Sequence, residues 1–379
     1  MKEGWTYKKL GELFPIVMGK TPPRNVSRYW DEKKETNNLW VSIADLSKYE
    51  GKEIHETKEH ISDEGKQGIK QIPKGSLLVS FKLTLGKMAF AGEKLYTNEA
   101  IMSLQRRDDV DLVFLYYYFS FLDWNKIASG NEKVKGKTLN KKSLSEILVA
   151  YIPLKDQHSI VARLDAAFAH IDALKANAEK QLAEARQLFQ AELTECMRPK
   201  EGWEEKTLPD ISENLDSIRI PVTKKNRTEG KYPYYGASGI VDYVDDYLFD
   251  EDLLCISEDG ANLLMRTYPI AFPISGKVWV NNHAHVLRFK SLITQKYVEY
   301  YFSGLKLDEY ITGAAQPKLT QKALNSIIIN IPQKIDIQRS IVSRLDALSA
   351  NIKKLEEVQR KTLAECDALK QAMLREVFE

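Results

Sequence analysis

The chain carries the run Ile160-Val161-Ala162-Arg163-Leu164-Asp165-Ala166 and later the near copy Ile341-Val342-Ser343-Arg344-Leu345-Asp346-Ala347. Each copy follows an Ile-Pro pair, at Ile152–Pro153 and at Ile331–Pro332, with a glutamine in between. Farther upstream, the tetrapeptide Lys-Glu-Gly-Trp opens each half of the chain. Matched segments at one long period predict a tandem duplication, in which a globular part is followed by a helical part twice.

Both copies begin a long segment of helical period. From Asp156 to Met197 apolar residues recur in steps of three and four, and no glycine or proline interrupts the run before Pro199. A helix of this length spans roughly 60 Å at about 1.5 Å per residue. A second such helix is predicted from Asp336 to about Phe378.

Each helix has a narrow apolar stripe, which must be buried against a partner. The nearest partner is the other helix, so we expect an intramolecular antiparallel coiled coil; the alternative is that each helix serves another subunit. The order of parts favours the antiparallel pairing, which would place the two globular domains at opposite ends of the coil. A parallel pairing would require the second domain to carry the chain back along the whole helix.

The globular parts contain short β-rich runs separated by Gly, Pro and Asn, such as Leu39–Ile43 and Ser76–Phe81, with one aromatic helix expected at Leu112–Leu122. There is no regular βαβ alternation, which favours an α+β class. The predicted fold is two pseudo-repeated α/β domains separated by two long helices packed as an antiparallel coiled coil. Its predicted parts are domain one at 1–155, helix one at 156–198, domain two at 199–335 and helix two at 336–379.

Bulk composition excludes some classes of protein. The 379 residues carry a net charge of +2, which argues neither for nor against a nucleic-acid partner. No apolar stretch suits a membrane span or a secretory signal, so a cytoplasmic protein is expected. The three cysteines, Cys196, Cys255 and Cys366, are scattered without CxxC spacing, which predicts free thiols and no structural zinc.

Motifs of catalysis are mostly missing. The segment Gly130…Gly136-Lys137-Thr138 has five residues between its glycines where a phosphate-binding loop has four, and no Gly-x-Gly-x-x-Gly follows a strand. His283 and His285 would share one face of a strand, so a metal pair is conceivable, although hydrogen-bonding histidines are favoured. We therefore expect no catalytic, cofactor or metal site in this chain.

What is present suits DNA. In the first domain, the loop Ser80–Lys87 is basic and contains Gly86, and lysines alternate over Lys133–Lys137. Such loops place ammonium groups on phosphates, while Asn and Thr can read base edges. A solvated Lys-rich hairpin is the alternative.

In the second domain, Tyr232–Ile240, Glu258–Asn262 and Asn281–His285 are turns rich in Tyr, Asn, His and Gly. Residues of these types are common where base edges are read. The alternative is that they make ordinary hairpin turns.

Taken together, the chain resembles the specificity subunit of type I restriction–modification systems. The resemblance covers both halves and rests on an ordered set of stretches: Gly19–Pro22 with Tyr29-Trp30, Ser80–Lys87, Thr97–Ile101, Gly136–Leu139, Tyr232–Ile240, Glu258–Ala261, Val280–Leu287 and Gln316–Leu319, with the Gln157 and Gln338 helix starts. The resemblance implies two target-recognition domains that read a bipartite, asymmetric DNA site. It also implies a subunit without catalysis of its own.

The same resemblance implies partners. These are double-stranded DNA, two methyltransferase (modification) subunits, and restriction or translocase subunits, with S-adenosylmethionine, ATP and magnesium held by those subunits and none by this chain. The residues that we predict to bind DNA are Lys20, Arg24, Lys82, Thr84, Lys87, Lys135, Lys137 and Asn140 in the first domain, and Tyr235, Ser238, Asn262, Arg266, Asn282, His283, Gln316 and Lys318 in the second. Two alternatives stay open: a two-headed scaffold that binds peptides, and a nuclease with an unrecognised active site.

Overall fold

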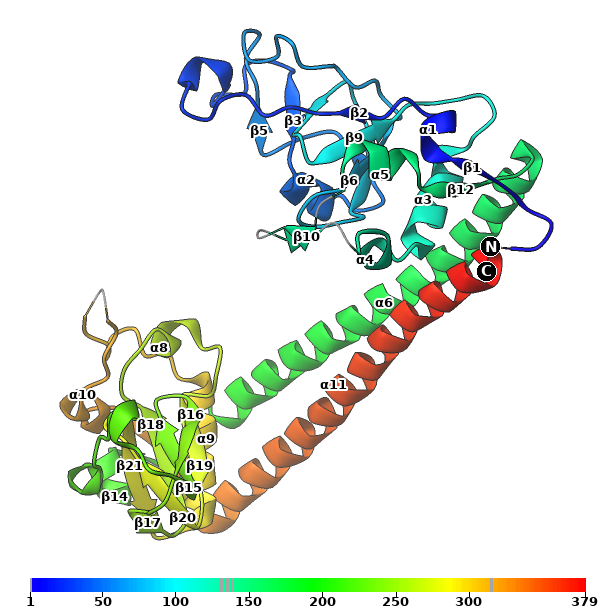
Figure 1. The fold of residues 1–379 in the computed structure, drawn as a ribbon. Helices are drawn as coiled ribbons and strands as arrows, with labels where there is room; N and C mark the ends of the chain where they lie inside the picture. Colours follow the sequence, from blue (N-terminus) through cyan, green and yellow to red (C-terminus); the bar gives the residue numbers. More distant parts are fainter. Residues whose placement is uncertain (1, 130–131, 134–135, 138, 314–315) are drawn as a thin grey trace. The chain divides into compact units, whose positions relative to one another are not determined.

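A computed structural model describes residues 2–129, 132–133, 136–137, 139–313 and 316–379. The chain divides into two compact units, Met1–Asn177 with Lys361–Glu379, and Ala178–Arg360. Each unit therefore holds one globular domain together with a portion of both long helices (Figure 1).

The first unit is built on a five-stranded sheet. Its strands lie in the order β2 (Val17–Met18), β9 (Ile101–Leu104), β6 (Leu77–Ser80), β7 (Met88–Ala91) and β4 (Glu53–Ile54). The further elements are β1 (Thr6–Lys9), α1 (Leu10–Leu13), η1 (Ser27–Tyr29), β3 (Leu39–Val41), α2 (Ile43–Lys48), β5 (Glu59–His60), β8 (Tyr96–Thr97), α3 (Leu112–Phe121), α4 (Trp124–Ile127), β10 (Glu132–Lys133), β11 (Gly136–Lys137), α5 (Lys141–Ser145) and β12 (Leu148–Tyr151). The aromatic helix α3 packs its buried face into the core that also contains Leu77, Val79 and Phe81.

The second unit has two four-stranded sheets. One has the order β14 (Ser212–Asn214), β21 (Ala284–Phe289), β18 (Leu253–Ser257) and β19 (Ala271–Ile274), and the other β16 (Gly239–Val244), β15 (Glu229–Gly236), β20 (Lys277–Val280) and β17 (Phe249–Asp250). The further elements are β13 (Trp203–Lys206), α7 (Leu208–Ile211), η2 (Asp216–Ile218), η3 (Lys224–Asn226), α8 (Asn262–Met265), α9 (Leu292–Gly304), α10 (Gln321–Asn325) and β22 (Ile329–Pro332). Buried Tyr297, Val298 and Phe302 of α9 cover the first of these sheets.

The predicted duplication is confirmed by matching hydrogen bonds at the domain–helix junctions. The Tyr117 hydroxyl donates to Asp165 at 2.5 Å, and the Tyr300 hydroxyl donates to Asp346 at 2.6 Å. The two aspartates belong to the repeated Arg-Leu-Asp-Ala runs. The repeated motif is therefore the part of each long helix that holds the globular domain.

The two repeated glutamines act in the same way. Gln157 donates to the Ile152 carbonyl and Gln338 to the Pro332 carbonyl, each at 2.8 Å. Both side chains are buried, at 1% and 6% exposure. Since a buried amide without partners costs free energy, these bonds fix how each helix leaves its last strand.

The long helices are α6 (Leu154–Cys196, 43 residues) and α11 (Ile335–Phe378, 44 residues). In the first unit, Asp172 and Lys175 of α6 pair with Lys370 and Asp367 of α11. Numbers rise along one helix while they fall along the other, so the pairing is antiparallel, as predicted.

In the second unit, Arg186 pairs with Glu356 and Glu192 with Arg344, which is the same antiparallel sense. Gln359, 7% exposed, donates to Gln181 at 2.7 Å. The apolar stripe of α6 is buried at Leu164, Ile171 and Ala178. Together these contacts confirm the predicted coiled coil.

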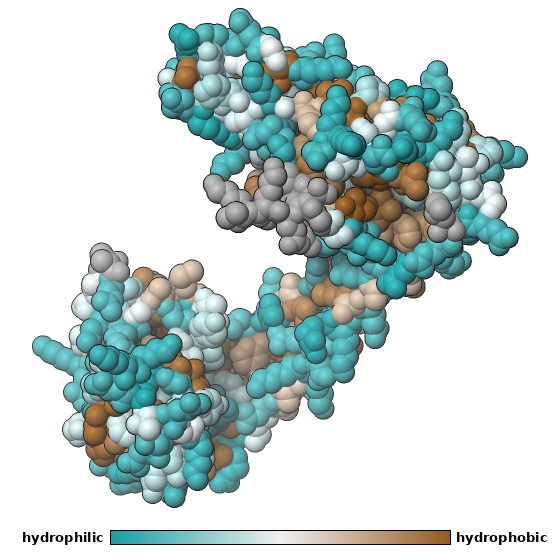
Figure 2. All heavy atoms as spheres, in the orientation of Figure 1, coloured by the Kyte–Doolittle hydropathy of each residue, from teal (hydrophilic) through white to brown (hydrophobic). Residues whose placement is uncertain are grey.

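All three cysteines are free thiols and buried, as expected. Burial raises the pKa of the Cys196 thiol to about 11, so this sulfur is held in its unreactive form. Among the described residues, no helix is long and apolar enough to cross a membrane. On the face shown in Figure 2, hydrophilic side chains cover most of each unit and hydrophobic residues show in small patches.

Candidate nucleic-acid interface

Four loops of the second domain converge at the ends of the strands β15, β18 and β21. The Glu258 amide donates to the His283 carbonyl at 2.9 Å, the Gly260 amide to the Pro317 carbonyl at 3.0 Å, and the Leu319 amide to the Glu258 carbonyl at 2.7 Å. The Ser257 hydroxyl donates to the Ala237 carbonyl in the β15–β16 turn. Loops far apart in sequence thus form one surface, which we call the second-domain loop cluster (residues 237–238, 258–260, 281–283 and 316–319).

Most residues predicted to bind DNA in the second domain lie on this cluster. Ser238, Asn282, His283, Gln316 and Lys318 are all exposed. The His283 ring pairs with Asp259 at 2.8 Å, and the Lys318 ammonium pairs with Glu258 at 3.1 Å. The cluster therefore presents amide, imidazole, hydroxyl and ammonium groups together, which suits contact with base edges and phosphates.

The other three predicted residues of this domain have structural roles. Arg266 donates to the carbonyls of Phe302, Ser303 and Leu305 where α9 ends, and burial lowers its pKa. The Asn262 side chain bonds both the amide and the carbonyl of Tyr268.

Tyr235 is half-buried and stacked on Phe272 at a centroid distance of 6.1 Å, and burial raises its pKa. The side-chain groups of all three residues are engaged within the protein. Their contact with DNA stays a prediction.

Beneath the second-domain loop cluster lies a buried charged group. His285 is 1% exposed, and Asp216, Glu258 and His285 bring three possible ligand atoms within 4.8 Å of one another. Each of the three side chains already has a partner. Asp216 and Glu258 contact Arg219, and the second ring nitrogen of His285 bonds the Leu319 carbonyl. An ion network suits these contacts better than the metal pair of His283 and His285 considered from the sequence.

The first domain forms the matching surface from the loop between β6 and β7. Thr84 is exposed, Lys82 is half-buried, and Lys87 pairs with Glu50 at 2.5 Å. The Leu139 amide donates to the Phe81 carbonyl at 3.0 Å, in the same way that Leu319 bonds Glu258. The chain before α5 is thereby tied to the loop after β6.

The remaining predicted residues of the first domain are more scattered. Lys20 is exposed beside Thr97, to whose carbonyl its amide donates at 2.9 Å. Arg24 pairs with Glu59 and lies over the Trp30 ring at 4.0 Å.

Asn140 accepts a hydrogen bond from the Ser143 amide at 2.9 Å and so caps α5. Lys135 lies outside the described residues. Lys137 belongs to β11, and its side chain is not among those described.

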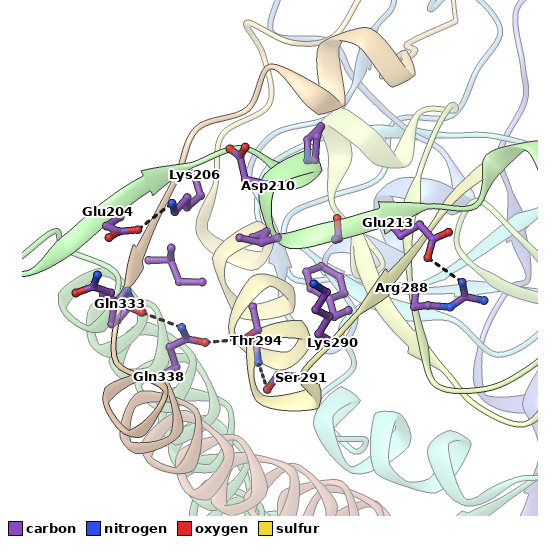
Figure 3. Close-up of a pocket in the computed structure, with 16 residues that line it drawn as sticks. Glu204, Lys206, Asp210, Glu213, Arg288, Lys290, Ser291, Thr294, Gln333 and Gln338 are labelled. Carbon is purple, nitrogen blue, oxygen red and sulfur yellow. Dashed lines mark hydrogen bonds and ion pairs between the residues drawn. The ribbon is translucent and has the colours of Figure 1, made fainter.

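A pocket of about 460 Å³ lies where α7, β14, β21, α9 and the start of α11 meet. Figure 3 shows three pairs among its charged and polar lining residues, Glu204 with Lys206, Glu213 with Arg288 and Gln338 with Thr294. The lining contains no histidine or cysteine, so it offers no nucleophile–base pair that uses either residue.

The model of the family "Type I restriction modification DNA specificity domain" matches residues 2–184 and again residues 200–365. The two matches cover both halves of the duplication and most of the chain.

The chain belongs to this family of type I restriction–modification DNA specificity proteins.

Relatives agree with this assignment. A type I restriction enzyme MjaIX specificity subunit from Methanocaldococcus jannaschii is 24% identical over 88% of this chain and 84% of its own length. The EcoprrI specificity subunit from Escherichia coli is 24% identical over 93% of this chain and 89% of its own. A putative specificity subunit from Haemophilus influenzae is 35% identical, but over only 38% of this chain and 37% of its own length.

Two solved structures share the fold. A chain from a structure on complex assembly and conformational transition of the type I R-M system superposes with a TM-score of 0.77, at 18% identity and with 100% and 98% of the two chains covered. The HsdS subunit from Thermoanaerobacter tengcongensis superposes with a TM-score of 0.55, at 18% identity and with 100% and 97% covered.

The structure also shows candidate contacts of the specificity protein that the sequence did not single out. Leu83 is 66% exposed and adopts φ of +63° in the β6–β7 loop, and Met265 is 73% exposed at the end of the helix α8. A leucine with positive φ is a genuine outlier, and outliers of this kind cluster at binding sites. The sequence marks Ser80–Lys87 as a basic loop but does not mark Leu83 within it, and it does not mark Met265, because leucine and methionine are ordinarily core residues.

Proposed function

We propose that this chain is the non-catalytic DNA-reading subunit of a type I restriction–modification complex. In this proposal each domain reads one half of a bipartite, asymmetric site through the loops at its strand ends. The long helices set the separation of the two half-sites. The chain then acts in the cytoplasm, on double-stranded DNA.

One observation carries the proposal. Both domains use the same backbone tie between the loop after a central strand and the segment before a short helix, from Leu139 to Phe81 and from Leu319 to Glu258. The side chains on the two loops nevertheless differ: Lys82 and Thr84 stand on the first, whereas Asp259 and Gly260 stand on the second. A repeated scaffold with unlike side chains is what two different half-sites require.

Membership of the family supports a proposal about partners. We propose that two methyltransferase subunits and the restriction subunits dock on this chain, and that S-adenosylmethionine, ATP and magnesium are bound by them. The outer faces of α6 and α11 are the surfaces proposed for docking, since their inner faces are buried against each other.

The experiment that tests the proposal maps methylated adenines in DNA from cells that carry this chain with its modification subunits. Replacing residues 203–330 by the corresponding domain of another specificity subunit should change one half-site and leave the other unchanged. A shift of both halves together would contradict the two-reader arrangement.

The alternatives are separated by simple measurements. Binding through several phosphates weakens steeply between low and moderate salt, whereas peptide docking by a scaffold need not. Magnesium-dependent cleavage of DNA by the purified chain alone would support a nuclease and contradict the proposal.

A further inference from the structure

The same three core positions differ in chemistry between the two domains. Ser80 lies opposite Ile101, and Ser257 lies opposite Ala284, so Phe81 corresponds to Glu258 and Met102 corresponds to His285. Both pairs also share a bond, because the amides of Phe81 and Glu258 donate to the carbonyls of Ala100 and His283.

The third position lies on β2 in the first domain and shortly after β14, in η2, in the second. Met18 lies opposite Met102 in the register of β2 and β9. Asp216 occupies the corresponding place, since its carboxylate contacts His285 and the amide of the preceding Leu215 donates to the Val286 carbonyl at 2.8 Å. Val286 follows His285 as Ser103, the register partner of Val17, follows Met102. Met18, Phe81 and Met102 of one domain thus become Asp216, Glu258 and His285 in the other.

In the second domain these residues form a closed ion network. The Asp216 carboxylate lies 2.6 Å from the His285 ring and 3.3 Å from the Arg219 guanidinium, and Glu258 lies 2.7 Å from Arg219 and 3.1 Å from Lys318. Burial acts to raise the pKa of both carboxyls, but hydrogen bonds and the nearby cations outweigh it, so each pKa lies below its ordinary value. The two carboxyls are therefore charged at neutral pH.

The histidine links this network to the loops above it. One ring nitrogen faces the Asp216 carboxylate, and the other faces the Leu319 carbonyl at 2.8 Å. Both neighbours are acceptors, so only the doubly protonated ring donates to both. The other charged groups around it are Glu258, Arg219 and Lys318, with the Asp259–His283 pair adjacent.

Such a network is not needed for the fold. Replacing a buried ion group by well-packed apolar residues is often neutral or stabilising, and the first domain has the apolar version, with Phe81 and Met102 fully buried. What the network adds is a set of bonds to the loops, because Leu319 is held by His285 and Lys318 by Glu258.

Building on the proposed function, we propose that Asp216, Arg219, Glu258 and His285 are positioning residues of the second domain alone. They hold the segment 316–319 and the Lys318 ammonium in the geometry that reads this domain's half-site. Asp216, Arg219 and His285 lie beneath the second-domain loop cluster. Glu258 belongs to the cluster, but it is 8% exposed and its carboxylate is bonded to Arg219 and Lys318, so all four residues act through the loop segment and not by touching DNA.

The test replaces the four residues, in the full-length chain, by those at the equivalent positions of the first domain, as Asp216→Met, Arg219→Thr, Glu258→Phe and His285→Met together. Thr21 is the equivalent of Arg219, because it follows Met18 by three residues as Arg219 follows Asp216. The quadruple variant should unfold at the same denaturant concentration as the wild type or a higher one. The amides of Gly260 and Leu319 should exchange hydrogen at least about tenfold faster. Discrimination against DNA altered in the second domain's half-site should fall about 10- to 100-fold, with the other half-site read as before.

Two further variants complete the experiment. Glu258→Gln keeps the shape and removes the charge that holds Lys318, so it should reduce the same discrimination about tenfold and leave the chain folded. Met102→Leu, at the position equivalent to His285, is the matched control. It should change neither the hydrogen exchange of the Gly260 and Leu319 amides nor the discrimination at the second domain's half-site.

Unchanged exchange at Gly260 and Leu319 in both the quadruple and the Glu258→Gln variants would overturn the positioning role. An equal loss of discrimination at both half-sites in these variants would also overturn the positioning role. If the wild type discriminates at neither half-site, the proposed function fails, and the exchange rates still decide whether the network holds the loops.

Discussion

One side chain on the loops of each domain separates base reading from phosphate contact. Asn282 is exposed on the turn before β21, so Asn282→Ala should lower affinity for the correct half-site by roughly 1–3 kcal/mol and change affinity for altered DNA little. Lys82→Ala should weaken binding to every sequence and flatten the salt slope by about one unit. Titrations of wild-type and half-altered duplexes at several salt concentrations measure both effects. The same uniform loss from both substitutions would contradict the assignment.

A buried carboxyl offers a test of stability. The Glu299 side chain is 16% exposed, and one of its oxygens has no hydrogen-bond partner among the residues that the structure describes. Burial, with the nearby Asp346 carboxylate, raises its pKa. The charged form is thus disfavoured in the folded state, and Glu299→Gln should raise the free energy of unfolding by about 0.5–1 kcal/mol at neutral pH.

Because the folded pKa of Glu299 is raised, the gain should shrink as pH falls towards the ordinary value of 4.5, where the wild-type carboxyl takes up a proton. Urea unfolding of the wild type and Glu299→Gln at several pH values measures this gain in the free energy of unfolding. Glu179→Gln, exposed on α6, is the control and should show no gain. A gain that grows at acid pH would contradict the argument.

Residue roles were predictable where local chemistry decides them and not elsewhere. The turn at Asn281–His283 was recognised from its composition, and the structure exposes Asn282 and His283 there. Asn140 was read as a DNA contact although an asparagine before a helix is equally suited to cap it, and it does cap α5. The partners of Arg266 could not be predicted from the sequence near it. The carbonyls that it bonds belong to Phe302–Leu305, and only tertiary packing brings them close to Arg266.

At the scale of elements, the junction between each domain and its long helix can be tested in duplicate. Tyr117→Phe and Tyr300→Phe each remove a hydroxyl that donates to an aspartate of the repeated run. Each substitution should lower the free energy of unfolding by about 0.5–1.5 kcal/mol. The two losses should be similar, because each bond joins a globular domain to the repeated run of its long helix. Tyr243→Phe, at a half-exposed ring, is the control. Denaturant midpoints measure the loss, and a large effect of only one variant would argue against equivalent junctions.

The elements themselves were predicted unequally. The long helices and α3 follow from periodicity within a continuous stretch, and the strands β3 and β6 lie within the predicted runs Leu39–Ile43 and Ser76–Phe81. The order of the strands within each sheet could not be predicted from the sequence. Strands of two to six residues, such as β2 and β14, find partners about 70 to 85 positions away, and no local pattern specifies such pairings.

For the whole molecule, the prediction concerns spacing. Inserting seven residues into α6 between Lys175 and Arg186, and seven into α11 between Glu356 and Asp367, lengthens both helices by roughly 10 Å. If the coil sets the distance between readers, the gap between the half-sites should grow by about 3 base pairs at 3.4 Å each, with the half-sites unchanged. Mapping methylated adenines measures the gap.

A matched control inserts the same seven residues into α6 alone, which breaks the register of the coil and should abolish recognition. An unchanged gap in the double insertion would show that the coil does not set the spacing. The duplication made this architecture predictable from the sequence, whereas the DNA sequence that is read depends on loop side chains whose chemistry many sites share.

The charged pairs between the long helices also affect which helices can pair while the chain is being synthesised. Lys175 and Arg186 both stand on α6, and their partners Asp367 and Glu356 both stand on α11. By the numbering that relates Ile160 to Ile341, Lys175 corresponds to Glu356 and Arg186 to Asp367. Two copies of α6 brought together in the same arrangement would therefore set lysine against arginine.

During synthesis α6 is complete long before α11 exists, because the whole second domain lies between Cys196 and Ile335. At roughly 5–20 residues per second, the ribosome needs on the order of ten seconds to reach the second helix. Throughout that interval the apolar stripe of α6 has no partner, and neighbouring nascent chains on one messenger carry the same stripe. Like charges at Lys175 and Arg186 oppose the premature pairing of two such chains, and Glu192 against Arg163 favours it. The helix α11 instead presents an opposite charge to Lys175, to Arg186 and to Glu192.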